Sequence, residues 1–173
     1  ASDVYKRQDS RQAYRYMNIG TAKPTDEQKS KAAHHLFDLI DPNEQFSLAN
    51  YLDAATSTIG SVLRRGSLPV IVGGSGQYVW ALAEGWTVPR VEPNASFRKK
   101  LETESEQRGS LYLHGLLKDV DPTSAQTINP NNIRRIIRAL EVFEFTGKTF
   151  SSLSGKESTS FDPYIAGLSL IHI

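Results

Sequence analysis

Apolar residues recur at helical spacing over residues 47–65, which makes this stretch the clearest predicted helix in the chain of 173 residues. Ser47 suits the N-cap position, and Gly66 followed by Pro69 marks the end of the pattern. The same periodicity and capping signals predict further helices over 25–35, 77–84, 94–108, 110–118, 122–128 and 133–146.

Two short apolar runs predict strands. Residues 69–72 form an unbroken run that is typical of a strand buried on both faces, and residues 36–40 form a second run that Asp41 and Pro42 end. A helix, a buried strand, a glycine turn and a helix in succession indicate an α/β fold with a parallel sheet. Residues 1–8 predict neither a strand nor a capped helix, because charges interrupt any apolar run.

Composition narrows the function classes. The formal net charge is +1, so a nucleic-acid partner would have to be bound by local basic patches. The chain contains no cysteine, which excludes a disulfide framework, a thiolate metal site and a cysteine nucleophile. No apolar run approaches the roughly 20 residues that span a bilayer, so we expect no membrane partner and a cytoplasmic location.

The first candidate for chemistry is the segment Asp9, Ser10, Arg11 and Gln12. A carboxylate that lies within reach of a reacting group can act as a general base. A neighbouring hydroxyl and amide can hydrogen-bond a planar polar substrate such as a base edge. The same residue types also form Asx turns and helix caps, so these residues alone leave both interpretations open.

The second candidate is the glycine turn Gly73, Gly74, Ser75 and Gly76, which follows the predicted strand and precedes a helix. Glycines allow backbone N–H groups to approach an anion, and the N-terminus of the helix favours negative charge. The turn therefore suits a phosphate or diphosphate, although it lacks the lysine of a Walker A motif. The alternative is a turn that needs glycine only for a positive φ angle.

Basic residues on the last predicted helix are the third candidate. Arg134 and Arg138 share a helical face and Arg135 lies beside it, an arrangement that suits phosphate contact. Glu141 and Glu144 follow Arg138, so a solvated, salt-bridged face is the alternative. Residues 98–100 form a second basic cluster with the same alternative. His34 and His35 have no metal-ligand spacing, and we assign no metal ligand to the chain.

These motifs together resemble the tRNA dimethylallyltransferase family, in order and over roughly residues 9–168. The matching stretches are 9–12, 17–24, 35–42, 72–78, 119–122, 129–142 and 147–148. The resemblance implies a P-loop NTPase-like parallel sheet core with a small helical insertion. It implies a monomeric enzyme that transfers a dimethylallyl group from dimethylallyl diphosphate to N6 of adenosine 37 in the tRNA anticodon loop. Mg²⁺ is implied as the cofactor, with no protein ligand assigned.

The resemblance also implies roles for individual residues. Asp9 is expected to act as the general base, and Ser75 takes the place of the family's threonine, whose hydroxyl lies near the diphosphate and the target base. Gly73, Gly74 and Ser75 are expected to bind the diphosphate. The expected tRNA contacts are Asp9, Ser10, Arg11, Gln12, Ser75, Arg98, Arg134, Arg135, Ile136, Ile137 and Arg138.

The chain departs from the family pattern at both ends, because the leading strand and P-loop do not match residues 1–8 and the family continues past residue 168. We therefore expect a non-native leader at 1–8 and a non-native tail at 169–173. The expected domains are an incomplete α/β core over 9–90 and 131–168 and a helical tRNA-binding insertion over 91–130.

On that basis we expect no detectable prenyl transfer by this chain alone, and a non-catalytic tRNA-binding fragment is the alternative function. A small-molecule phosphotransferase is a third hypothesis, against which the missing Walker lysine argues.

Overall fold

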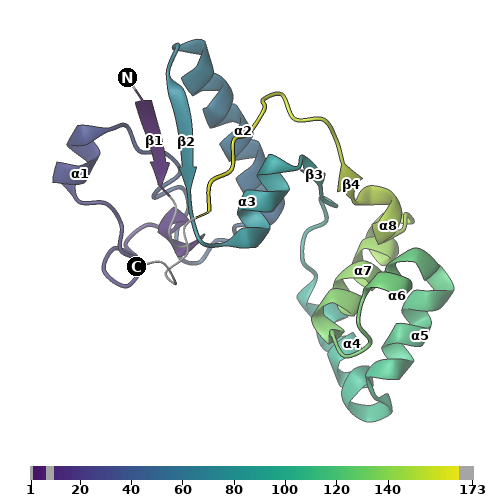
Figure 1. Cartoon of the computed structure of the whole chain (residues 1–173). Helices are drawn as coiled ribbons and strands as arrows, with labels where there is room; N and C mark the ends of the chain where they lie inside the picture. Colours follow the sequence, from purple (N-terminus) through teal and green to yellow (C-terminus); the bar gives the residue numbers. More distant parts are fainter. Residues whose placement is uncertain (1, 7–9, 168–173) are drawn as a thin grey trace. The chain divides into compact units, whose positions relative to one another are not determined.

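The computed structural model describes residues 2–6 and 10–167 (Figure 1). The chain divides into two compact units. The first, which we call the α/β unit, comprises residues 1–86 and 157–173, and the second, the helical unit, comprises residues 87–156.

The sheet of the α/β unit pairs strand β1 (Ser2–Lys6) with strand β2 (Leu68–Val72). The pairing is parallel, with Ser2 opposite Leu68 and Lys6 opposite Val72. This parallel pair agrees with the predicted α/β class. The prediction that residues 1–8 contain no strand is wrong, because β1 is built by backbone hydrogen bonds to a distant strand, which the local charge pattern does not report.

Strand β2 is less buried than its apolar sequence suggests. Leu68 is 65% exposed and Val72 is 36% exposed, and the three residues between them are half-buried. In the described part of the chain β2 has β1 as its one sheet neighbour, so part of its surface stays open to solvent. The prediction of burial on both faces is therefore wrong here.

Two helices build the core of the α/β unit. Helix α2 (Leu48–Arg64) buries Tyr51, Ala55 and Ile59, and helix α3 (Gly76–Ala83) adds Leu82 to the same cluster. The rings of Tyr51 and Tyr78 meet edge to face, with their centroids 4.8 Å apart. Because Tyr78 belongs to α3, this contact fixes the helix whose N-terminus follows the glycine turn.

Residues 10–46 wrap around this core with little regular structure. They contain a 3₁₀ helix, η1 (Ser10–Ala13), and a short helix, α1 (Asp26–Lys31). The strand predicted over 36–40 is wrong, since only an isolated bridge joins Tyr14 to Ile40. Leu36 and Asp38 have φ angles of 62° and 55°, and left-handed residues of this kind interrupt an extended strand.

The helical unit packs five helices around a second core. They are α4 (Ala95–Arg108), α5 (Ser110–Val120), α6 (Pro122–Thr127), α7 (Ile133–Thr146) and α8 (Phe150–Leu153). Side chains of Asn94, Asp121, Asn132 and Thr149 cap the helices that follow them. Strands β3 (Trp86–Thr87) and β4 (Gly155–Lys156) form a separate two-stranded sheet.

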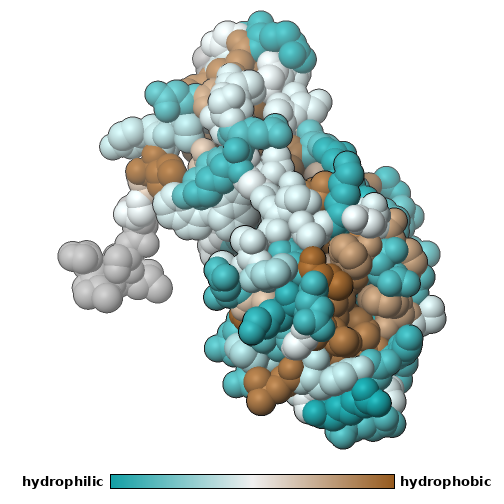
Figure 2. Space-filling view, turned by 90° about the vertical axis from the view of Figure 1, so that its right-hand side faces the viewer, coloured by the Kyte–Doolittle hydropathy of each residue, from teal (hydrophilic) through white to brown (hydrophobic). Residues whose placement is uncertain are grey.

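Helix α7 supplies four of the nine buried residues in the core cluster of the helical unit. Ile136, Ile137, Ala139 and Leu140 lie in one buried cluster with residues of α4, α5 and α6. The expected boundary, which placed residues 131–168 in the α/β core, is corrected for residues 131–156, because the apolar face of α7 is covered by the other helices of this unit, whereas residues 157–167 lie in the α/β unit. Hydrophobic side chains also reach the surface of the helical unit (Figure 2), and Leu111 is 73% exposed.

Candidate functional site

The segment that follows Asp9 begins the first candidate site. Asp9 itself and the side chain of Ser10 lie outside the described part of the chain, and Arg11 is exposed. Gln12 is 1% exposed, and its Nε2 donates to the carbonyls of Thr21 (2.6 Å) and Ala22 (3.1 Å). The side chain of Gln12 therefore holds the following loop and does not face solvent, where a base edge would approach.

The loop over residues 14–24 is fixed by a second buried polar side chain. The side chain of Lys23 is 5% exposed and pairs with Asp38 at 2.6 Å. Its Nζ also donates to the carbonyl of Tyr14 (2.5 Å) and to Asn18 Oδ1 (3.2 Å). These bonds tie together stretches of the chain that are 5 to 15 residues apart in sequence, so Lys23 maintains the shape of the loop.

Backbone strain gathers in the same part of the α/β unit. Among the described residues, the non-glycine residues with positive φ are Tyr16, Ala22, Leu36 and Asp38. Such conformations persist only where the surrounding structure enforces them, and they are concentrated at functional sites. Two of these residues, Ala22 and Asp38, are held by hydrogen bonds from Gln12 and Lys23.

The glycine turn links β2 to α3. Gly73 and Gly74 are exposed, and a Cβ atom built on Gly74 would meet nothing within 4 Å. The described glycines with positive φ lie elsewhere, at residues 66, 85, 109 and 147. The interpretation that this turn needs glycine for a positive φ is therefore wrong, and neither conformation nor packing requires glycine at residue 74. The glycines leave the backbone of the turn open to solvent, and an open backbone allows the close approach of a ligand.

Ser75 occupies the N-cap position of α3. Its side chain makes no capping hydrogen bond, although serine is among the residues preferred for that bond. The side chain is half-buried and lies at the N-terminus of α3, toward which the N–H groups of the first helical turn point. A hydroxyl, an open glycine backbone and a helix N-terminus together can accommodate an anion.

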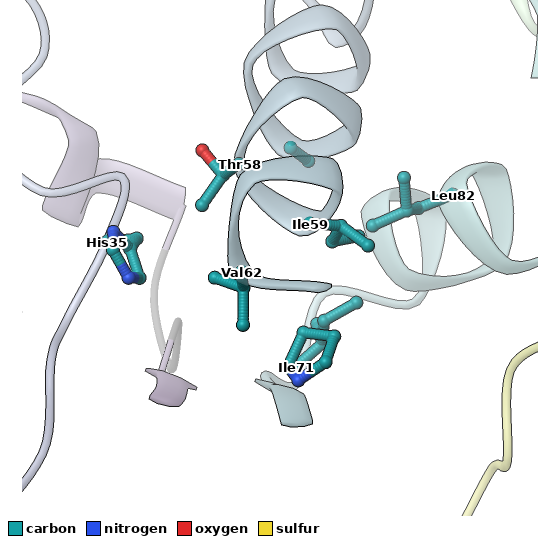
Figure 3. A pocket seen from close by; sticks show the side chains of 8 residues that line it. His35, Thr58, Ile59, Val62, Ile71 and Leu82 are labelled. Atoms are coloured by element: carbon teal, nitrogen blue, oxygen red, sulfur yellow. The ribbon is translucent and has the colours of Figure 1, made fainter. Parts of the chain in front are cut away.

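A small cavity lies behind β2 (Figure 3). Apolar side chains from α2, α3 and β2 line it, together with Thr58 and with His35 from the preceding loop. Its volume is about 10 Å³, room for about one water molecule. None of the predicted site residues lines it, so we assign it to packing.

The basic stretch of α7 divides into exposed and buried residues. Arg134 and Arg135 are exposed. Ile136 and Ile137 are 0% and 3% exposed and belong to the core. Side-chain contacts between these two isoleucines and tRNA, which the resemblance implied, are incompatible with this burial. The helical period explains the difference, because residues 136 and 137 face the other helices of the unit.

Arg138 and Arg98 are both paired with Glu141, whose side chain is 0% exposed. Arg98 donates Nε to Oε1 (2.8 Å) and Nη2 to Oε2 (2.7 Å), and Arg138 Nη1 donates to Oε2 (2.7 Å). The backbone N–H of Asn94 adds a bond to Oε1 (2.8 Å). The salt bridge that the alternative predicted for Arg138 is present, but the expectation of a solvated face is wrong for Glu141, which is buried.

Burial by itself would raise the pKa of Glu141, but the hydrogen bonds from Arg98, Asn94 and Arg138 outweigh burial and lower it. The hydrogen bond between Arg98 and Glu141 in turn raises the pKa of Arg98. Glu141 is therefore a buried carboxylate anion with two guanidinium partners. The sequence predicted Glu141 only as a partner of Arg138 on a solvated face, and its burial and its pairing with Arg98 were not predicted, although an acidic residue between Leu140 and Val142 in an apolar stripe is an available signal.

Within residues 2–6 and 10–167, no three side chains of His, Cys, Asp or Glu come together as a metal site. No helix in this part of the chain combines the length and apolar character needed to cross a membrane.

Comparison with known proteins finds one matching protein family and similar proteins within it. The family model described as IPP transferase matches residues 12–171. A tRNA dimethylallyltransferase of Roseiflexus sp. (strain RS-1) is 52% identical over 143 residues, which are 83% of this chain and 47% of that protein. The tRNA dimethylallyltransferase of Roseiflexus castenholzii is 49% identical over 156 residues, which are 90% of this chain and 50% of that protein.

A solved structure shows the same fold. The structure is of a eukaryotic dimethylallyltransferase acting on tRNA, with a TM-score of 0.63 and 24% identity, and the match covers 87% of this chain and 37% of that one. This likeness and the parallel pairing of β1 with β2 confirm the P-loop NTPase-like α/β class. The chain spans about half the length of the curated relatives that it matches.

Proposed function

The chain belongs to the IPP transferase family, and we propose that it takes part in tRNA prenylation. The proposed reaction transfers a dimethylallyl group from dimethylallyl diphosphate to N6 of adenosine 37 in the anticodon loop. The names of the similar proteins support this reaction class. The observation that carries the proposal is the glycine turn at the N-terminus of α3, with its exposed backbone and a Ser75 hydroxyl that caps nothing.

We assign the diphosphate-binding site to the glycine turn at residues 73–76. Backbone N–H groups of Gly73 and Gly74 and of the first turn of α3 donate to the phosphate oxygens, and the helix dipole favours their charge. Ser75 Oγ donates a further hydrogen bond. Because these donors are in place before the ligand binds, they also stabilise the charge that develops on the diphosphate as it leaves.

The acceptor amine needs a base. The lone pair of an exocyclic adenine amine is delocalised, so the amine is a poor nucleophile until its proton is removed as the C–N bond forms. We assign this role to Asp9 on the resemblance alone, because Asp9 lies outside the described residues. The adenine must first leave the stack of the anticodon loop to reach the base and the allylic carbon.

Arg134 and Arg135 are the proposed phosphate contacts of the helical unit. Both are exposed at the start of α7. The net charge of the chain is only +1, so RNA binding must depend on such local groups. Among the described residues no three side chains of His, Cys, Asp or Glu come together, so we assign no protein ligand to Mg²⁺.

An NMR titration tests the proposed diphosphate-binding site. Dimethylallyl diphosphate, and inorganic diphosphate as a second probe, are added to ¹⁵N-labelled chain while amide chemical shifts are recorded. The largest shifts are expected at residues 73–77. The N-terminus of α2 is the matched control, because Ser47 and Asn50 cap it and it should not respond. Saturating probe without shifts at residues 73–77 would overturn the proposal.

A second titration, with an anticodon stem-loop, separates the two functions that the sequence left open. Binding of RNA that weakens with salt, together with binding of the diphosphate, supports the transferase. RNA binding with no response to either diphosphate probe would support the non-catalytic RNA-binding alternative instead.

A further inference from the structure

The charges around Glu141 do not balance. One buried carboxylate is hydrogen-bonded to two guanidiniums, so these three side chains together carry one positive charge, and Glu102 on α4 interacts with Arg98 through its charge, with no hydrogen bond between them. The side chain of Arg98 is 37% exposed and that of Arg138 is 29% exposed, whereas Glu141 is fully buried. The remaining positive charge is therefore presented to solvent through the arginines, and most of all through Arg98.

The two arginines are held differently. Arg138 Nη1 also donates to the carbonyl of Val91 (2.9 Å) and its Nη2 to that of Pro89 (3.2 Å), so its guanidinium joins α7 to the segment that precedes α4. Arg98 binds Glu141 side-on through Nε and Nη2, which leaves Nη1 for another acceptor. A planar guanidinium fixed along one edge presents its other donors in a defined direction.

We propose that Glu141 is a positioning residue of the RNA interface, which holds the guanidinium of Arg98 so that its Nη1 binds a phosphate of the RNA. The proposal rests on the proposed function, since it takes RNA as the partner. It assigns Arg98 to phosphate contact and Arg138 to maintaining the fold. Glu141 touches no RNA and acts through Arg98.

The chemistry favours positioning over simple charge. A long exposed arginine loses rotamer freedom when it binds a ligand, and a side chain that is already fixed loses less. The bond from the N–H of Asn94 to Glu141 also ties the carboxylate to the N-terminus of α4, the helix that carries Arg98. Carboxylate, helix start and arginine thus form one rigid group.

The test uses a substitution for which charge and positioning predict opposite results. Glu141→Gln preserves the size of the side chain and makes the unit more positive by one charge. If charge alone mattered, the variant would bind an anticodon stem-loop RNA more tightly. Positioning predicts binding that is about tenfold weaker, because the charge-assisted bonds that fix Arg98 are lost.

Glu144→Gln is the matched control. Glu144 is exposed on the same helix, so its substitution removes the same charge without disturbing a buried pair. Equal or slightly tighter binding is expected. Both variants are compared with the whole wild-type chain, well below the unfolding temperature of each protein as measured by circular dichroism.

A double-mutant cycle keeps the inference testable where Glu141→Gln loosens the fold. Arg98→Gln leaves Glu141 bonded to Arg138 and Asn94. If Glu141 acts through Arg98, the double variant binds RNA no more weakly than Arg98→Gln alone. Additive losses, or a folded Glu141→Gln variant that binds as tightly as wild type, would overturn the inference and leave the proposed function standing. A wild-type chain that binds no stem-loop at all would overturn both.

Discussion

Helices α2 and α3 of the α/β unit both begin at a serine, and the structure uses the two serines differently. Ser47 accepts a hydrogen bond from the N–H of Asn50, whose side chain accepts one from the N–H of Ser47 (3.0 Å), forming a capping box. Ser75 stands at the same position of α3 and caps nothing. Two serines at the same helix position therefore differ in what the fold uses them for, so residue type and helix position alone do not separate a structural hydroxyl from one that is available to a ligand.

The same contrast recurs in the helical unit. Arg138 is bonded to two backbone carbonyls and to Glu141, and its removal would disturb the fold. Arg134 and Arg135 are exposed on the same helix. Substitutions of groups that the fold uses should therefore lower stability, and substitutions of the others should lower ligand binding.

The largest loss of stability is expected at Asp121. Its carboxylate caps α6 through the N–H (3.0 Å) and Oγ (2.6 Å) of Ser124, and binds the N–H (2.9 Å) and Oγ (2.7 Å) of Ser151. Asp121→Ala should lower the free energy of unfolding by about 3 kcal/mol in urea titrations. Exposed Asp119→Ala is the control, with a change below about 0.5 kcal/mol. Equal losses of stability in Asp121→Ala and Asp119→Ala would contradict the claim that the hydrogen bonds of Asp121 stabilise the fold.

The two buried carboxylates also predict how stability depends on pH. Burial opposes the shift, but hydrogen bonds from Ser124 and Ser151 lower the pKa of Asp121, as those from Arg98, Asn94 and Arg138 lower that of Glu141. The unfolded chain therefore takes up protons at higher pH than the folded chain does. The contribution of these two carboxylates to the free energy of unfolding should be fully present near neutral pH and should be lost as the pH drops below about 4.

Unfolding titrations across that pH range check this expectation. The fall should be shallower in Glu141→Gln, which has lost one of the two titrating groups. An identical pH profile in the variant would show that Glu141 contributes nothing to acid sensitivity.

A smaller loss is expected at the cap of α2. Ser47→Ala removes the side-chain acceptor for Asn50 N–H, whereas the backbone N–H of residue 47 can still donate to Asn50 Oδ1. The free energy of unfolding should fall by about 1 kcal/mol, measured by urea denaturation. Ser47→Asp, which preserves the acceptor, should recover most of the loss.

The smallest effect on stability is expected at Ser75. Because its side chain makes no capping bond, Ser75→Ala should change the free energy of unfolding by less than about 0.5 kcal/mol. A loss as large as that at Ser47 would mean that the hydroxyl belongs to the fold, and the contrast between the two helix starts would disappear.

Local signals predicted much of this structure. Ser47 and Gly66 bracket α2, Asp121 with Pro122 begins α6, and Gly147 ends α7 in a left-handed conformation. These signals act within a few residues of the helix ends, so the sequence reports them directly. The turn at residues 73–76 was likewise identified from its glycines.

Features that depend on distant residues were missed. Strand β1 exists through its pairing with β2, more than sixty residues away. Glu141 is bonded to Arg98 and Asn94, which are 43 and 47 residues away. Gln12 and Lys23 resemble site residues in sequence, yet both hold a loop. No local pattern distinguishes a polar side chain that binds a ligand from one that binds its own backbone.

Calorimetric titration of dimethylallyl diphosphate into the wild-type chain, Ser75→Ala and Ser75→Thr tests the central claim most directly. The predicted result is affinity about tenfold lower for Ser75→Ala, the loss of one hydrogen bond to a charged ligand, with unchanged stability. Ser75→Thr keeps the hydroxyl and should bind as wild type does. Equal affinity of wild type and Ser75→Ala would contradict the assignment of this hydroxyl to the diphosphate.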